Sequence, residues 1–203
     1  MADGPRPELA ELYIADPPQR WRELGFAIED DRLPVGGVDV RLGGEGHGIT
    51  GWTLRHLGST GDLDGLPTAV TTTAPPPAVT HSNRVVGIDH VVITTGDFDR
   101  TAAVLAARGI PLRRVRQAGN HRQGFRRLGR SVMEIVEAPG LQGAPRFWGL
   151  VFVVADLEAL REQLAPHVNE IRSAVQPGRQ IATLAASAEL GTQVAFMDPE
   201  KGA

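Results

Sequence analysis

Three stretches of the chain share one pattern of apolar and polar positions. In each, a short apolar run ends at an aspartate, and a helical pattern of apolar residues follows. The stretches are ELYIADPPQRWRELGF (11–26), HVVITTGDFDRTAAVLAARGI (90–110) and WGLVFVVADLEALREQL (148–164). An aspartate side chain accepts the free N–H groups of a first helical turn, so Asp16, Asp97 and Asp156 are predicted as helix N-caps. Gly25 and Gly109 are predicted to end their helices in the left-handed conformation.

Three strand-like runs separated by glycine, proline or asparagine follow each predicted helix. Each unit therefore reads β-α-β-β-β, and the predicted units cover 1–57, 85–139 and 146–199. A Thr-, Pro- and Gly-rich stretch, 58–84, is predicted to be a linker over the surface. One unit cannot bury its own sheet face, so we expect an α+β fold in which 85–203 is one domain of two paired units.

The composition narrows the class of protein. The 203 residues carry a net charge of −3 and include no cysteine, so any metal would need His, Asp, Glu or water as ligands. The charge does not favour nucleic acid. The N-terminus lacks the apolar core of a signal peptide, and no run approaches the roughly 18 apolar residues of a membrane span. We expect a cytoplasmic protein with no nucleic-acid or membrane partner.

The repeated unit, with GIDHVVI on a first strand and VMEIVE on a fourth, resembles the vicinal oxygen chelate superfamily, also called glyoxalase-like or bleomycin-resistance-like. GIDHVVITTGDFDRT, FWGLVFVVADLEAL, VQPGRQIATL and VAFMDP are also similar to a group of glyoxalase-like proteins common in actinobacteria, most without an assigned function. The resemblance is strongest over 85–199. It implies two units in a curved mixed sheet around a pocket. It also implies that a divalent metal (Zn, Ni, Mn, Fe or Mg), where present, takes ligands from the first and fourth strands of both units.

Carried over by this resemblance, His90 and Glu134 match a first-strand and a fourth-strand metal ligand and are the candidate catalytic residues. Alternation in a strand places His90 on the same face as Val92 and Thr94. Glu134 shares its face with two valines, where a carboxylate is costly to bury without a partner. We therefore expect His90 and Glu134 to meet on the concave side, through a metal or through a direct hydrogen bond.

The other half of such a site lacks ligands in the sequence. Alignment of the third unit on the second places Gly149 opposite His90 and Ala195 opposite Glu134. Two protein ligands are few for a transition metal, which usually takes three or more. Three alternatives remain open: a metal site, a metal-free hydrogen-bonded pair in a ligand pocket, or a purely structural placement.

Other residues are candidates for contact with a ligand. Arg179 follows a Pro-Gly turn in QPGRQ and is expected at the pocket rim, where an arginine suits a carboxylate or phosphate. Phe125, Trp148 and Gln123 are expected to line the pocket, although strand aromatics equally suit a core. The arginines of GFRRLGR (124–130) suit either an anion or a charged outer strand face.

These observations support several hypotheses about function. The first is a protein that binds a small organic molecule, without a complete metal site, as the bleomycin-resistance branch implies. The second is a metal-dependent lyase, isomerase or dioxygenase, in which the metal stabilises an enediolate-like oxyanion and the carboxylate is the base. The third is an assembly module without catalysis.

The first unit, 8–57, has no obvious partner, because units close two at a time. Its apolar sheet face would then be exposed, which favours a two-fold homodimer in which two copies of this unit pair. The alternative is that the first unit packs against the 85–199 sheet of its own chain and leaves a monomer.

Overall fold

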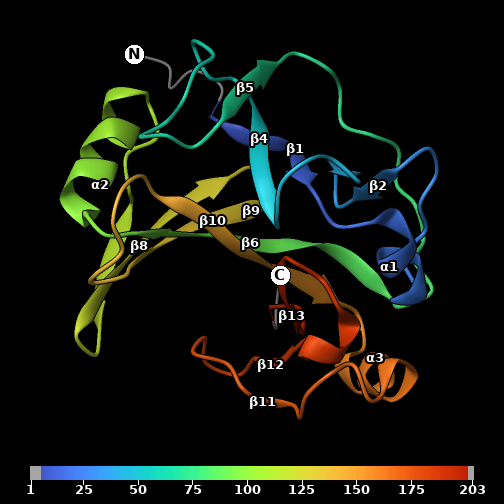
Figure 1. The fold of residues 1–203 in the computed structure, drawn as a ribbon. Helices are drawn as coiled ribbons and strands as arrows, with labels where there is room; N and C mark the ends of the chain where they lie inside the picture. The colour runs from blue at the N-terminus through green and yellow to red at the C-terminus, as the bar shows by residue number, and fades with distance from the viewer. Residues whose placement is uncertain (1–5, 201–203) are drawn as a thin grey trace.

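A computed structural model describes residues 6–200, and within them the strands form two sheets (Figure 1). The smaller sheet has the order β2-β3-β1-β4-β5 and the larger β11-β12-β13-β10-β6-β9-β8-β7. The smaller sheet consists of β1 (Glu8–Ile14), β2 (Arg32–Val35), β3 (Val38–Leu42), β4 (Ile49–Arg55) and β5 (Thr68–Thr71). The larger consists of β6 (Val85–Thr95), β7 (Arg114–Ala118), β8 (His121–Leu128), β9 (Ser131–Glu137), β10 (Arg146–Val154), β11 (Arg172–Ser173), β12 (Gln180–Thr183) and β13 (Gln193–Met197). The helices are α1 (Pro18–Glu23), α2 (Phe98–Ala107), α3 (Leu157–Leu164) and the short 3-10 turn Ala186–Ala188.

The larger sheet confirms the predicted fold and the pairing of the second and third units. In each unit the first strand pairs parallel with the last, β6 with β9 and β10 with β13. β6 and β10 pair antiparallel and join the two units at the centre of one curved mixed sheet. Asp97 and Asp156 cap α2 and α3 as predicted, since their side chains accept from backbone N–H groups at 3.0 Å. Gly25 and Gly109 have the predicted left-handed backbone, with φ of 83° and 82°.

The first unit has the predicted order of elements but a different pairing. β1 pairs parallel with β3 and antiparallel with β4, so the parallel partner comes one strand earlier than in the other units. The segment predicted as a linker, 58–84, contains β5, which pairs parallel with β4. The order β2-β3-β1-β4-β5 therefore repeats β8-β9-β6-β10-β13 with the same strand directions. The small sheet is a reduced version of the large one, in which a loop replaces the second helix.

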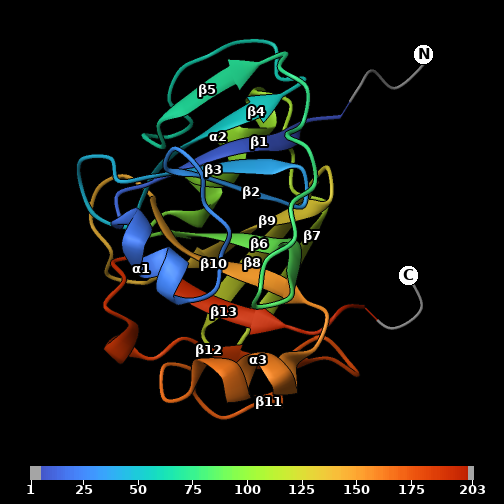
Figure 2. The same cartoon turned by 90° about the vertical axis from the view of Figure 1, so that its right-hand side faces the viewer.

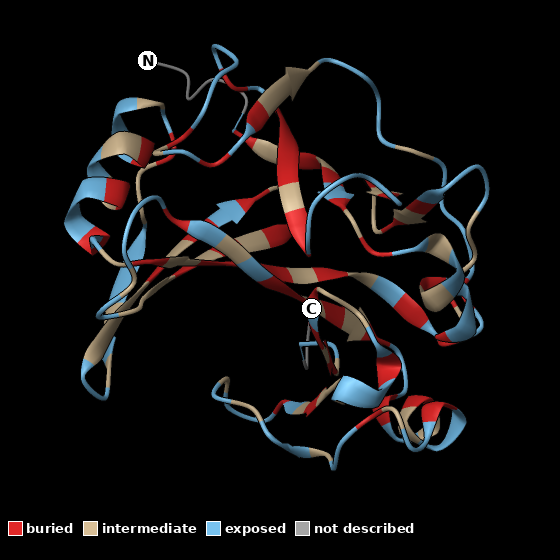
Figure 3. Ribbon diagram, in the orientation of Figure 1, coloured by how far each residue is buried: buried red, intermediate tan, exposed pale blue. Residues whose placement is uncertain are grey.

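The small sheet packs on the large sheet through a shared core (Figures 1 and 2). Trp21 of α1 and the nearby Phe26 contact Phe152 of β10, with ring centroids 6.0 and 5.2 Å apart. Trp52 of β4 packs edge-on against Phe147 at 5.2 Å. These aromatic contacts join the two sheets into one hydrophobic core, which appears as the band of buried residues in Figure 3.

This packing removes the reason for the expected homodimer. The apolar sheet residues of the first unit are largely buried within a single chain, and Leu12, Ile14 and Trp52 are at most 1% exposed. The alternative arrangement, in which the first unit packs on its own chain, is therefore the one in the structure. Among the described residues, no helix is both long and apolar enough to cross a membrane.

Asp16 is not the cap of α1, which corrects the sequence prediction. The N-cap is Pro17, which makes no side-chain hydrogen bond to the helix. The Asp16 carboxylate instead accepts from the backbone N–H groups of Gly191, at 2.6 Å, and Thr192, at 3.2 Å. An aspartate one residue before the cap is thus free to hold a turn of the third unit against the first.

The β2–β3 hairpin lies close to β6 because its turn consists of glycines. Gly36 and Gly37 have φ of 60° and 88°, as a two-residue turn with both central residues left-handed requires. A Cβ on Gly36 would lie 2.7 Å from the Cα of Gly87 on β6. A larger residue would therefore push the two sheets apart at this edge.

Candidate functional site

A cavity of about 360 Å³ lies on the face of the large sheet that carries His90, Val92 and Thr94. We call it the cup. Its lining comes from both units and is mostly apolar, including Val92, Leu150 and Ala195. Among the described residues that line it, Glu134 is the one acidic side chain and Arg172 the one basic side chain.

A β-bulge in β6 places a group of polar side chains near the cup but outside its wall. Along the β6–β10 ladder Val151 pairs with His90 and Phe152 with Ile88, so Asp89 is an additional residue without a partner. A bulge of this kind re-aims a side chain. The Asp89 carboxylate contacts the Nδ1 atom of its neighbour His90, although simple alternation would place the two on opposite faces.

Arg179 is the second partner of Asp89. Its Nη2 atom lies 2.7 Å from Asp89 Oδ1, and its Nε donates to the carbonyl oxygen of Asp198 at 2.8 Å. Burial acts to raise the pKa of Asp89, but the interactions with His90 and Arg179 outweigh it and leave the pKa below its ordinary value. Asp89 is therefore held ionised, and it orients the His90 ring.

Glu134 lines the cavity, and its pKa is shifted in the opposite direction from that of Asp89. Burial raises the pKa of Glu134, and the positive charges of His90 and Arg116 oppose that rise only in part. Within the described residues the Glu134 carboxyl makes no hydrogen bond. The cup thus holds a carboxyl group that takes up a proton more readily than an ordinary glutamate and has no protein partner to satisfy it.

His90 and Glu134 lie on one face of adjacent strands. β6 and β9 pair with His90 opposite Val132 and Val92 opposite Glu134, so the two side chains are offset by one repeat of the strand. His90 is 6% exposed, and its contacting carboxylate is that of Asp89. Sequence reasoning missed Asp89, and the only signal for it was its place in the Asp-His pair.

Some of the remaining candidate residues lie in the wall of the cup and others lie outside it. Gln123 and Trp148 line the cup, and Trp148 is 55% exposed. Phe125 lies opposite Glu134 in the β8–β9 ladder, where Arg116 stacks on its ring at 5.2 Å, but it is not part of the cavity wall. Arg179 was expected at the rim and is instead buried, at 8% exposure, because it neutralises Asp89. The exposed arginine in the wall is Arg172 of β11. It lies in the strand-like run EIRSAVQ, where the sequence pattern did not distinguish it as a candidate.

The third unit contributes no metal ligand at the equivalent positions. A Cβ on Gly149 would lie 2.4 Å from the carbonyl oxygen of Gln193, so that position has no room for a side chain. Ala195 lines the cup with a methyl group. Residues 6–200 contain no group of three or more His, Asp or Glu side chains placed to hold a metal ion. The set of donor side chains thus falls short of what a divalent transition metal usually takes from a protein.

We expect the substitution Glu134→Gln to stabilise the protein at neutral pH. A carboxyl with a raised folded-state pKa contributes stability below its unfolded pKa, and that contribution is lost as the pH rises through the folded pKa. Glutamine does not ionise, so the variant should melt about 2–4 °C above the unaltered protein at pH 7. At pH 4 the two proteins should melt at the same temperature. Thermal melting of both proteins across this range measures the effect. An equal difference at both pH values would contradict the assignment.

No family model and no curated protein matches this sequence. Solved structures with a similar arrangement include a methylmalonyl-CoA epimerase from Mycobacterium tuberculosis, with 16% identity, a TM-score of 0.49, and coverage of 62% of this chain and 93% of the other. A hypothetical protein from Bacillus halodurans has 16% identity and a TM-score of 0.46, over 57% of this chain and 96% of the other. A Streptomyces coelicolor methylmalonyl-CoA epimerase variant in complex with 2-nitronate-propionyl-CoA has 18% identity and a TM-score of 0.46, over 58% and 96%. These likenesses concern the fold alone, and the large sheet is the curved mixed sheet of two β-α-β-β-β units that the sequence predicted.

Proposed function

We propose that this protein binds a small organic molecule in the cup, with an apolar or aromatic body against the valines and a polar group at Glu134. The observation that carries the proposal is the Glu134 carboxyl, which faces an otherwise largely apolar cavity with no hydrogen-bond partner among the described residues. A polar group left unsatisfied in such a place destabilises the empty protein. A ligand that supplies a carbonyl or hydroxyl group removes this penalty.

The mouth of the cup favours a ligand with a negative charge. Arg172 is exposed in the wall and makes no ion pair with the described residues. Trp148 presents its indole beside the same opening. A molecule with an aromatic or aliphatic body and a carboxylate therefore has a partner for each part.

A second candidate function is proton transfer on the bound molecule, as in an isomerase or lyase. The raised pKa of Glu134 favours it, because general acid–base catalysis works best when the pKa of the group approaches the operating pH. Glu134 would accept or donate the proton. His90, held by Asp89, lies on the same face of β6 as Val92 but is not part of the cavity wall, so the proton transfer rests on Glu134. Exchange of a ligand C–H proton with deuterated water, lost in Glu134→Gln, distinguishes this function from binding alone.

Binding is tested with two probes that share one apolar body, phenylbutyrate and phenylbutanol. We expect the acid to bind about tenfold more tightly, because Arg172 pairs with its carboxylate. Trp148 reports binding by fluorescence, since Trp21 and Trp52 are fully buried. In Trp148→Phe the fluorescence change should be lost, and isothermal calorimetry on the same variant measures whether the probe still binds.

Two variants separate the parts of the site. Arg172→Gln should bring the acid down to the affinity of the alcohol and leave the alcohol unchanged. Arg146→Gln, an exposed arginine at the start of β10 that does not line the cup, is the matched control and should change neither. If neither probe binds, or if both arginine variants act alike, the cup is not the site.

Two further expectations stay proposals. A cytoplasmic location suits a chain of 203 residues without cysteine, since disulfides form in oxidising compartments.

The homodimer no longer has an exposed face of the first unit to support it. Light scattering of the purified protein measures its mass, and a value near 21.7 kDa contradicts the dimer.

A further inference from the structure

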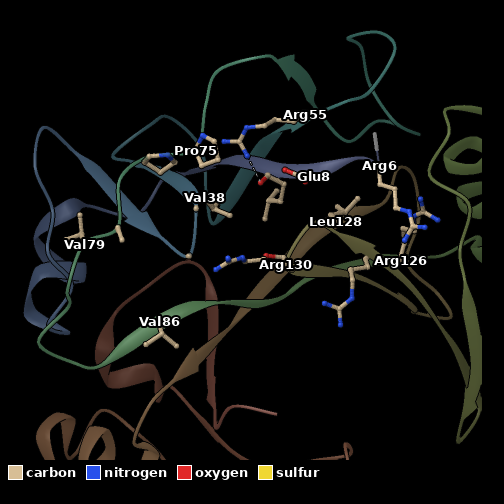
Figure 4. Close-up of a pocket in the computed structure, with 18 of the residues that line it drawn as sticks. Arg6, Glu8, Val38, Arg55, Pro75, Val79, Val86, Arg126, Leu128 and Arg130 are labelled. Atoms are coloured by element: carbon tan, nitrogen blue, oxygen red, sulfur yellow. Dashed lines mark hydrogen bonds between the residues drawn. The ribbon is translucent and has the colours of Figure 1, made fainter. Parts of the chain in front are cut away.

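A second, larger cavity, of about 1000 Å³, lies away from the cup, between the small sheet and the outer end of the β8–β9 hairpin (Figure 4). Among the described residues, six arginines line it, together with one acid, Glu8. The six are Arg6, Arg55, Arg113, Arg126, Arg127 and Arg130, and we call the cavity the arginine cleft. The chain as a whole has a net charge of −3, so this concentration of positive charge is local.

One of these arginines is buried without a carboxylate. Arg55 is 7% exposed, and its guanidinium donates to the backbone carbonyls of Thr73, at 2.8 Å, and Leu9, at 3.4 Å. Within the described residues it has no ion pair, and its Nη2 makes no hydrogen bond. Glu8 lies opposite Arg55 in the β1–β4 ladder, but the two side chains make no ion pair, so the Arg55 guanidinium keeps donor capacity in the wall of the cleft.

Two more arginines are exposed and uncommitted. The side chains of Arg127 and Arg130 make no hydrogen bond or ion pair with residues 6–200. In Figure 4, Arg130 extends into the middle of the cleft below Glu8. Flexible guanidinium groups beside a buried one can bind the oxygens of a phosphate from several sides.

The opposite end of the cleft is apolar. Val79 and Val86 line it and are 42% and 55% exposed, among the most exposed large apolar side chains of the described residues. Pro75 also lines the cleft, and Figure 4 places Val79 and Val86 toward one end, Arg55 beside Pro75, Arg130 in the middle and Arg126 at the other end. The cleft therefore combines apolar side chains at one end with guanidinium groups from its middle to its other end, which matches the two parts of an amphiphilic anion.

We propose that the arginine cleft is a second binding site, for a soluble phosphate ester with an apolar chain. The phosphate would lie among Arg55, Arg127 and Arg130, and the chain would cover Val79 and Val86. A concave cleft suits a single molecule better than a membrane surface, which needs a convex or flat face. A nucleic acid would gain nothing from the apolar end.

Calorimetry with monoalkyl phosphates, from ethyl to hexyl and below their micelle concentrations, tests this proposal on the full chain. Affinity should rise about two- to fourfold for each added methylene and should weaken as salt is raised. The double variant Arg127→Gln/Arg130→Gln should weaken binding about tenfold or more. The matched control Arg114→Gln/Arg146→Gln removes two exposed arginines that do not line the cleft and should stay within about twofold of the unaltered protein.

Val79→Ser/Val86→Ser should abolish the dependence on chain length while ethyl phosphate still binds. Arg172→Gln should leave alkyl phosphate binding intact, which separates this site from the cup. Equal loss in the two double arginine variants would overturn the proposal. So would capture by phosphatidic acid vesicles, or binding to an oligonucleotide, without binding of the soluble esters.

Discussion

Phe152→Ala is expected to lower the free energy of unfolding by about 3–5 kcal/mol. Phe152 is fully buried on β10 and contacts Trp21 of α1, the nearby Phe26 and Phe196 of β13. Its removal leaves a cavity where the two sheets meet, and the backbone of a central strand cannot move to fill it. Urea unfolding, followed by fluorescence and by circular dichroism, measures the loss.

The control for this substitution is Val86→Ala on β6, where the side chain is 55% exposed. It should change stability by no more than about 0.5 kcal/mol. The two signals should also follow one transition in Phe152→Ala, because the sheets share one core. Two separate transitions, or a loss below about 1 kcal/mol, would show that the sheets do not depend on this contact.

Arg179→Met is expected to cost about 3–5 kcal/mol at pH 7. The substitution keeps most of the buried volume but removes the guanidinium and leaves the Asp89 carboxylate beside the His90 ring. The pKa of Asp89 is lowered in the folded protein, so its contribution to stability is present above the unfolded pKa and is lost as pH falls through the folded pKa. The penalty of the variant should therefore be smaller at pH 3 than at pH 7, because the contribution of Asp89 to stability falls as the pH falls.

A surface ion pair is the control for the buried one. Arg122 pairs with Asp99 at 2.8 Å, and the Asp99 side chain is 80% exposed. Asp99→Ala should change stability by about 0–1 kcal/mol. Chemical denaturation of both variants at the two pH values makes the comparison. If Arg179→Met is as mild as Asp99→Ala, the Asp89–Arg179 pair does not stabilise the sheet beside the cup.

Local sequence determined the elements of 85–199 and how they pair. Asp97 and Asp156 act through hydrogen bonds to residues three positions away, and so their role is readable from spacing alone. Alternation placed His90 and Glu134 on one face, because the period of a strand is fixed by its backbone. The short connection between the second and third units favoured their pairing within one chain.

Tertiary structure decided the rest, because it depends on contacts between residues far apart in the chain. Asp16 has the sequence context of a cap, yet it binds a turn 175 residues away. Asp89 contacts His90 through a bulge, which depends on the register of β6 against β10. Long-range contacts also separate two arginines that lie in similar polar stretches: Arg179 is drawn inward by Asp89, whereas Arg172 stays at the mouth of the cup. The arginine cleft exists only because the small sheet packs beside the β8–β9 hairpin, and no local pattern encodes that packing.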